Sequence, residues 1–396
     1  FGLLRPCVIG RAPGLALLQM AADRAPPAQG RAVAGPARLI AAVEAAAPVD
    51  GRGRRLVANR PCRKGEALLR EEPLLLWGPD ARRDVIAEGG EALLAVAGEL
   101  GPTGEDALAA FCALRRAPAT AQAAVAELVG GEAEAAQDAE LALYGLTERP
   151  AELASDAEVR QLASLVGIIA ANAAENEDGR RALYEVLSMA NHSCKPNAAW
   201  HTRGARGGVK ELVCISTNIE EGEEVCISYL PERALFELER QARRERLSEG
   251  RAFECLCTRC AGQGDEDGGE KKEERLRSLA TSLLAASETP PTTKEEAVQQ
   301  CKDLGGRLRE LDRLWPAASA LKASLWDAYA RLLFRYGAPE ALTHGAARRA
   351  LEESRPCVSD IAWVEQGRLL QEALTPRPAA AAPPAAPAAT TSDSAG

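Results

Sequence analysis

Short apolar and alternating segments are the first pattern along the chain, and they predict β-strands. Residues 54–58, 67–70 and 73–77 read as three strands separated by turn residues. The same pattern returns at 212–216 and 224–229, on either side of a glycine turn. Strands at both ends of a long intervening segment predict one β domain that is split in the sequence.

Helical periodicity accounts for most of the remaining chain. Between 81 and 175, Ala, Leu and Glu recur at helical spacing, which predicts a helical insert. Residues 182–190 read as an apolar helix, and 231–247 read as a charged one. A polar, glycine-containing linker is predicted at 265–274, and helices are predicted again over 275–375.

Composition and charge narrow the functions that such a fold can serve. The chain has 396 residues, 46% of them hydrophobic, and a formal net charge of −9. A phosphate-binding surface needs clustered positive charge, so direct binding of nucleic acid is not expected. An acidic surface suits a basic peptide better. The sequence has no run of 18 apolar residues, so no membrane partner is expected.

Both ends of the sequence differ from its middle. Residues 1–45 carry five arginines and two acidic residues, which predicts a disordered leader or the remnant of an organelle presequence. Residues 376–396 are rich in Pro, Ala, Ser and Thr, and a disordered tail is predicted there. The expected location is the cytoplasm, the nucleus or both, with organelle import as the alternative.

Three of the eleven cysteines, Cys255, Cys257 and Cys260, form a tight cluster. Such spacing points to a metal site rather than to disulfides. Structural zinc is almost always bound by four sulfur or nitrogen ligands, so the cluster needs a fourth ligand from elsewhere. Cys214 and Cys226 lie in apolar strands, where they are expected to act as small core residues.

Three polar motifs carry candidate chemistry. Gly51-Arg52-Gly53 would let the backbone approach a ligand closely, although an ordinary turn explains such a motif equally well when it stands alone. Residues 191–197, with the sequence Asn-His-Ser-Cys-Lys-Pro-Asn, offer many hydrogen-bonding groups at one tight turn, for which a capping turn is the alternative. Residues 222–229 end at Tyr229 and lead through a helix to Phe253 and the cysteine cluster.

In this order, the patterns GxG, NHSCxPN, GEExxxxY and FxCxCxxC resemble the SET domain and its post-SET zinc segment. The split SET domain, the FEC-x-C-x-x-C ending and the helical C-terminal region resemble the SMYD family in particular. The resemblance implies an α+β fold. Its parts are a SET-type β-fold of short strands with a pseudoknot-like active site, a helical insert, a post-SET zinc segment and an all-α, TPR-like C-terminal domain. Two helices around Gly337 would form a hairpin of that last domain.

The predicted organisation follows from these segments. It consists of the leader at 1–45, the N-terminal part of the SET domain at 46–80, the helical insert at 81–160, the C-terminal part of the SET domain at 161–231, the post-SET zinc segment at 232–262, the TPR-like domain at 275–375 and the tail at 376–396. The chain departs from the family in three respects. The insert has a single cysteine, Cys112, so a zinc-binding MYND module is absent, and Lys195 stands where an acid is usual. Arg251 lies near a position where relatives often carry a tyrosine.

The resemblance implies a methyltransferase that uses S-adenosylmethionine to methylate a lysine of a protein substrate. It places Gly51, Arg52 and Gly53 along the methionine moiety of the cofactor. The remaining contacts that it implies are Asn191 and His192 at the adenine edge and sulfonium side, Phe253 on the adenine, Tyr229 beside the methyl group, and Asn172. A C-terminal helix cap explains the last of these equally well. The zinc ligands it implies are Cys194, Cys255, Cys257 and Cys260.

Methyl transfer to lysine requires a neutral amine, whereas free lysine has a pKa of about 10.4. The enzyme therefore needs an apolar channel and a group that aligns the nitrogen lone pair. Tyr229, a phenol at a strand end, fits the aligning role, and packing against the core is the alternative. On the helix that follows, Arg240, Arg243, Arg244 and Arg246 alternate with glutamates, which predicts a solvated, salt-bridged face.

Two classes of function remain open at this point. One is a protein-lysine methyltransferase acting on a histone or another protein. The alternative is a catalytically inactive SET-fold scaffold for protein–protein interaction. The sequence names neither the substrate protein nor the oligomeric state.

Overall fold

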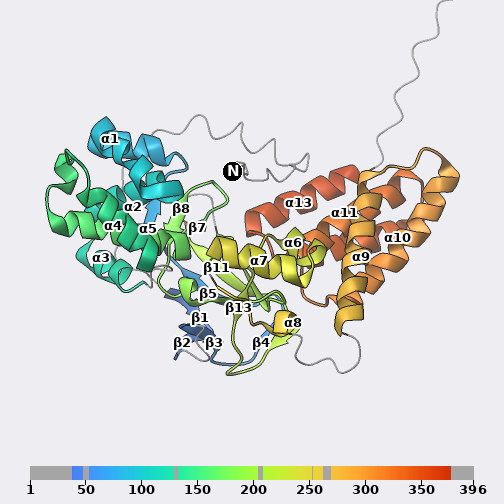
Figure 1. Ribbon diagram of the computed structural model, residues 1–396. Coiled ribbons are helices and arrows are strands. Elements are labelled where there is room, and N and C mark those ends of the chain that lie inside the picture. Colours follow the sequence, from blue (N-terminus) through green and yellow to red (C-terminus); the bar gives the residue numbers. More distant parts are fainter. Residues whose placement is uncertain are drawn as a thin grey trace, which may run out of the picture.

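The computed structural model describes residues 38–47, 53–128, 133–203, 208–251, 253–261 and 269–375. Figure 1 shows helices at both sides of a central region of short strands, with the insert on one side and the C-terminal helices on the other. The fold is α+β, as expected. None of the described helices is long and apolar enough to cross a membrane.

The central region is built from small sheets, the largest having four strands in the order β1-β5-β11-β10. These strands are β1 (Arg38–Ala41), β5 (Ala67–Glu71), β11 (Lys210–Cys214) and β10 (Ala198–Thr202). Strand β5 pairs with β11 in antiparallel register, with Leu69 opposite Leu212. Both of these leucines are buried. Segments from before and after the insert thus share one sheet, as expected for a domain split in sequence.

Four smaller sheets complete the β region, in the orders β12-β4, β13-β9, β2-β3 and β6-β8-β7. Their strands are β2 (Val43–Ala46), β3 (Arg55–Ala58), β4 (Cys62–Arg63), β6 (Leu75–Trp77), β7 (Ala174–Glu175), β8 (Arg181–Leu183), β9 (Asn191–His192), β12 (Asn218–Ile219) and β13 (Cys226–Ile227). Among the paired strands in the described residues, only β13 and β9 run parallel.

The insert is helical, as its periodicity predicts. It contains α1 (Ala81–Leu94), η3 (Ala95–Thr103), α2 (Gly104–Arg116), α3 (Ala119–Ala126), α4 (Ala133–Tyr144), η4 (Ala151–Leu153) and α5 (Asp156–Asn172). The start of α5 is fixed by a capping box, in which Ser155 and Glu158 satisfy each other's backbone N–H groups. Buried Phe111 and Leu108 of α2 pack in one apolar core with α5 and β6. The insert is thereby fastened to the strands on either side of it.

The C-terminal region consists of α9 (Gly269–Glu288), α10 (Lys294–Leu314), α11 (Ala320–Arg335), α12 (Glu340–Ser354) and α13 (Asp360–Ala373). The predicted hairpin is α11 and α12. Gly337 adopts a positive φ of 69° between them, and Pro339 precedes the first turn of α12. Between the strands and these helices lie α6 (Glu232–Glu237), α7 (Arg240–Arg251) and α8 (Thr258–Ala261).

Four segments differ from the expectation from sequence. The single helix expected at 231–247 is broken at Leu238, whose backbone is extended, into α6 and α7. The helix expected at 182–190 is instead strand β8 followed by η5 (Leu187–Met189). Helix α9 begins at Gly269, within the expected linker at 265–274. The strands begin at Arg38, within the expected leader.

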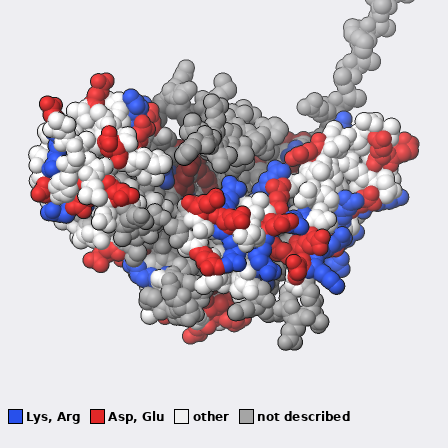
Figure 2. Space-filling view, viewed as in Figure 1, with Lys and Arg blue, Asp and Glu red and all other residues white. Residues whose placement is uncertain are grey.

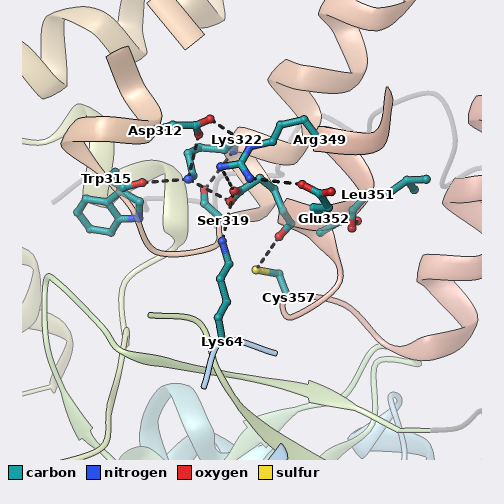
Figure 3. A network of polar contacts seen from close by, with 11 residues as sticks. Lys64, Asp312, Trp315, Ser319, Lys322, Arg349, Leu351, Glu352 and Cys357 are labelled. Carbon is teal, nitrogen blue, oxygen red and sulfur yellow. Dashed lines mark hydrogen bonds and ion pairs between the residues drawn. The ribbon is translucent and has the colours of Figure 1, made fainter. Parts of the chain in front are cut away.

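A buried ionic joint connects the β region to the C-terminal helices (Figure 3). Glu353 of α12 is fully buried, and its carboxylate contacts three cations: Lys64 at 3.3 Å, Lys322 at 3.0 Å and Arg349 at 2.8 Å. Lys64 comes from the turn before β5, and the other two come from α11 and α12. Lys322 also donates to the carbonyl of Trp315 at 2.9 Å. Because Glu353 and Lys322 are shielded from water, each of these two charges depends on its partners.

We predict that Lys322→Met lowers the free energy of unfolding by about 3 kcal/mol, since it leaves Asp312 and Glu353 without a buried cation. Urea unfolding followed by circular dichroism measures the change. Lys302→Met is the matched control, because Lys302 is exposed on the neighbouring helix α10. Equal unfolding midpoints for the two variants would contradict the prediction.

Candidate active site and metal centre

The candidate site lies where the parallel pair β9 and β13 brings two motifs together. Asn191 pairs with Cys226, and His192 pairs with Ile227. Beyond this short ladder, Ser193 N donates to the Ile227 carbonyl at 2.8 Å. The motif at 191–197 therefore lies alongside the segment that ends at Tyr229.

The Asn197 side chain stabilises the crossing, by which we mean the parallel pairing of β9 with β13. Its Oδ1 accepts from the backbone N–H of Cys226 at 2.8 Å, and its Nδ2 donates to the carbonyl of Glu224 at 2.9 Å. The Asn197 backbone N–H donates to the Cys226 carbonyl at 3.2 Å. One amide side chain thus pairs with the backbone just before β13 and at its first residue. The sequence analysis included Asn197 in the motif but gave it no role.

Tyr229, His192 and Phe253 come together at the crossing. The ring centroids lie 5.4 Å apart for His192 and Tyr229, 6.0 Å for His192 and Phe253, and 6.1 Å for Tyr229 and Phe253. The Tyr229 hydroxyl donates to the carbonyl of Ala190 at 2.7 Å, which fixes its orientation. Tyr229 and Phe253 are both half-buried, so the cluster keeps some access to solvent.

His192 connects the aromatic cluster to the cysteines. Its Nδ1 accepts the backbone N–H of Tyr229 at 2.9 Å, so the proton of the neutral ring is on Nε2, 3.3 Å from Cys194 Sγ. Burial lowers the pKa of His192 to about 4. The ring is therefore neutral at physiological pH and serves as a fixed hydrogen-bonding link between Tyr229 and Cys194.

The four predicted metal ligands, Cys194, Cys255, Cys257 and Cys260, are all buried, and their Sγ atoms lie within 4.8 Å of one another. Cys194 Sγ is 3.4 Å from Cys260 Sγ and 4.0 Å from Cys255 Sγ. A tetrahedron with zinc–sulfur bonds of about 2.3 Å places its sulfurs about 3.8 Å apart. Hydrogen bonds with the neighbouring thiols lower the pKa of Cys257 and raise the pKa of Cys194. The donor set and its size are compatible with structural zinc.

Glu71, which no sequence motif marks, fixes the backbone of the segment that leads to Ala190 and β9. This fully buried carboxylate accepts three successive backbone N–H groups, from Glu185 at 2.7 Å, Val186 at 2.9 Å and Leu187 at 2.8 Å. Those N–H groups are consequently unavailable to a helix, which explains why 182–190 is not helical. The resulting turn ends at Ala190, whose carbonyl receives the Tyr229 hydroxyl. In the sequence Glu71 lies between Arg70 and Glu72 at the end of β5, so no local signal marks it as buried.

The remaining predicted cofactor residues lie outside the aromatic cluster and the cysteine cluster. Gly53 has a positive φ of 74°, and apart from its chain neighbours no atom of the described residues lies within 4 Å of where a Cβ would be. Asn191 Nδ2 donates to Glu224 Oε1 at 2.8 Å. Asn172 ends α5, and its Nδ2 donates to the Ile168 carbonyl at 2.9 Å, which is the helix-cap alternative. Gly51 and Arg52 lie outside the described residues.

Comparisons with known proteins agree with this geometry. The SET domain family model matches residues 53–230. Histone-lysine N-methyltransferase ASHR2 of Arabidopsis thaliana is 32% identical over 100 residues, covering 23% of this chain and 24% of that protein. Protein-lysine N-trimethyltransferase SMYD5 of Gallus gallus is 37% identical over 92 residues, covering 23% and 21%. The chain thus spans about a quarter of the length of the curated relatives it matches.

The SET domain of LSMT, solved with methyllysine and AdoHcy, covers 86% of this chain and 89% of its own at 12% identity, with a TM-score of 0.35. That score is too low to align the two sites residue by residue.

The family match shows that residues 53–230 of this chain form a SET domain, and the parallel pairing of β9 with β13 lies within it. The proteins that match this chain include SMYD5 of Gallus gallus, SMYD4 of Danio rerio and SMYD3 of Mus musculus, in agreement with the motif resemblance.

Elemental analysis of the purified chain is expected to find a single zinc ion, held by the four clustered sulfurs. Cys194→Ser should remove most of this zinc, because it replaces the one ligand that lies outside the 255–260 segment. Cys301→Ser serves as control, since Cys301 is a half-buried thiol of α10 outside the cluster. Full zinc content in Cys194→Ser would show that the fourth ligand is wrongly assigned.

Proposed function

We propose that this protein transfers a methyl group from S-adenosylmethionine to a lysine side chain of a protein substrate. The observation that carries the proposal is the fixed hydroxyl of Tyr229, held by the Ala190 carbonyl inside the aromatic cluster. The names of the relatives support it, because ASHR2 and SMYD5 are both called lysine methyltransferases.

The residues around the crossing suit such a cofactor. Phe253 offers a half-buried aromatic face for an adenine, and Asn191 and His192 offer polar groups beside it. Gly53, with its positive-φ backbone, would border the methionine moiety together with Gly51 and Arg52. When bound, S-adenosylmethionine supplies an electrophilic methyl group on a positively charged sulfur.

Tyr229 is assigned the aligning role in the transfer. Its O–H donates to Ala190, so the phenol oxygen keeps lone pairs that can accept an N–H of the incoming amine. Such a contact would direct the nitrogen lone pair away from Tyr229 and toward the methyl group. An ammonium beside the positively charged sulfur would be repelled and has no lone pair to donate, so the lysine releases its proton to solvent before transfer.

The metal centre is assigned a structural role. Cys255 lies two residues after Phe253, and Cys194 lies two residues after His192. A single ion bound by both cysteines would hold the Phe253 ring against the His192 and Tyr229 pair. The metal therefore sets the position of the adenine-facing ring without touching the reacting atoms.

Calorimetric titration with S-adenosylmethionine separates this proposal from the inactive scaffold. The enzyme requires saturable binding to the zinc-loaded protein, whereas the scaffold predicts none. Phe253→Ala should weaken binding by about tenfold or more, the loss of one aromatic contact in a ligand pocket. Phe334→Ala, a half-buried phenylalanine of α11, should leave binding unchanged. No heat of binding to the folded, zinc-loaded parent would refute the proposal.

Tyr229→Phe is predicted to reduce turnover by about two orders of magnitude, the usual effect of removing one preorganised hydrogen-bonding group at a reacting centre. Cofactor affinity should stay within a few-fold, because the ring is kept. Labelled cofactor and a peptide array supply the turnover measurement, and calorimetry supplies the affinity.

The matched control is Tyr336→Phe, since the Tyr336 hydroxyl also donates to a backbone carbonyl, that of Pro291 at 3.0 Å, in the C-terminal helices. Equal turnover in the two variants would mean that Tyr229 only packs against the core.

A further inference from the structure

A group of fully or largely buried charges contacts the cysteine cluster through the carbonyl of Cys194. Its members are Arg243 of α7, Arg259 of α8 and Glu273 of α9. Figure 2 shows acidic and basic side chains interleaved over the visible face around α7, which is the solvated surface that the sequence predicts. Arg243 is the exception, because it is fully buried.

Both arginines converge on Glu273. Arg243 Nη1 donates to Glu273 Oε1 at 2.5 Å, and Arg259 donates to the same carboxylate twice, at 2.7 Å and 2.8 Å. Burial raises the pKa of Glu273, but Arg259 and then Arg243 lower it by more, so it stays a carboxylate. One acid from the C-terminal helices therefore bridges two cations that belong to the metal segment.

Arg259 also contacts the cysteine cluster itself. It lies between two of the ligands in sequence, and its Nη1 donates to the carbonyl of Cys194 at 2.9 Å. Its guanidinium carbon lies 5.2 Å from the ring centroid of Trp315, at the end of α10. The Arg259 side chain is thus held on three sides, by the cluster, by Glu273 and by Trp315.

Arg243 is buried with only part of its hydrogen-bonding capacity used, and it shares its one carboxylate partner, Glu273, with Arg259. Its Nη1 is used by Glu273 and by the Leu238 carbonyl, but Nε and Nη2 have no hydrogen-bond acceptor among the residues that the structure describes. Burial lowers the pKa of Arg243, while Glu273 and, after it, the sulfurs of Cys194 and Cys260 raise it, and the net change is upward. Both arginines share Glu273, so Arg243 is joined through this carboxylate to Arg259 and thereby to the carbonyl of Cys194.

The net charges of the two groups explain why it is favourable for them to lie side by side. Two arginines and one glutamate carry a net charge of +1, and burying such a charge unpaired is costly. Four thiolates around a divalent ion carry a net charge of −2, which is equally costly to bury alone. Placed side by side, the two groups offset most of each other's desolvation penalty.

We propose that Arg243 and Arg259 are the counter-charge of the metal–thiolate centre and that Glu273, by bridging them, ties the C-terminal helices to that centre. The inference rests on the metal site of the proposed function and extends it from the four ligands to their surroundings. It assigns α9 a docking position that depends on bound metal.

Zinc release from the full-length protein tests the counter-charge. A chromogenic zinc chelator in excess follows the release rate. Arg243→Met should release zinc about 10- to 100-fold faster than the parent, the scale for losing a partner that surrounds a metal ligand. Arg246→Met is the control on the same helix, because Arg246 is exposed, and it should release zinc at the parental rate. Equal rates for the two variants would overturn the proposal.

Glu273→Gln tests the bridge and is the milder substitution. It removes a negative charge beside the centre while both arginines stay, so zinc release should remain within about threefold of the parent. Amide hydrogen exchange in α9 should nevertheless become faster, because the bridge is weakened. Glu274→Gln, at the exposed neighbouring position, should change neither measurement. A salt bridge without a role at the metal would instead give Arg243→Met and Glu273→Gln the same effects on both measurements.

Removal of zinc from the parent completes the test. Exchange in α9 should rise on chelation, while exchange in α12, which is held by the Glu353 joint, should stay unchanged. Unchanged exchange in α9 would overturn the coupling. Protein purified without zinc would refute the metal assignment itself, which is a different failure from zinc-loaded protein that ignores Arg243→Met.

Discussion

The crossing at Asn197 is the constraint on which the rest of the site depends. A two-residue parallel ladder supplies few backbone hydrogen bonds, and the Asn197 side chain adds two more, to the N–H of Cys226 and to the carbonyl of Glu224. Tyr229, His192 and Cys194 all lie within a few residues of this ladder. One amide therefore determines whether the aromatic cluster and the fourth sulfur face each other. Glu71 acts on the segment before β9, where it accepts three backbone N–H groups and prevents the segment from forming an α-helix.

Local patterns in the sequence were sufficient for much of this architecture. Apolar runs located β5 and β11, and the Gly337 and Pro339 signals located the hairpin of α11 and α12. Motif spacing selected residues that the fold indeed brings together, the four cysteines and the Tyr229 cluster among them. The failures share a physical cause, which is a partner distant in sequence. Residues 182–190 have helical composition, but Glu71 takes their N–H groups, and no local pattern reports a carboxylate on another strand.

The same cause explains why Arg243 and Glu273 were misjudged. Alternating charges on a helix normally mark a solvated face, but Arg243 is buried and pairs with Glu273 of α9. Glu273 lies in a polar stretch that resembles a linker, yet its two arginine partners make it part of an ordered helix. Polar residues in this protein therefore mark the contacts between its parts. Lys64 with Glu353, and Ser359 with Glu177 at 3.1 Å, are further examples.

The joint between Lys64 and Glu353 has a consequence for the order of folding. Its two residues are 289 positions apart, so Lys64 cannot pair with Glu353 until α12 has been synthesised. The cysteine cluster closes a shorter loop, because Cys194 and Cys260 are separated by 66 positions. Closing loops of such different lengths costs chain entropy that rises slowly with length, and contacts between distant residues slow folding. During synthesis the β region therefore emerges from the ribosome well before it can complete its charged contacts, and it reaches its final stability only as the C-terminal helices dock.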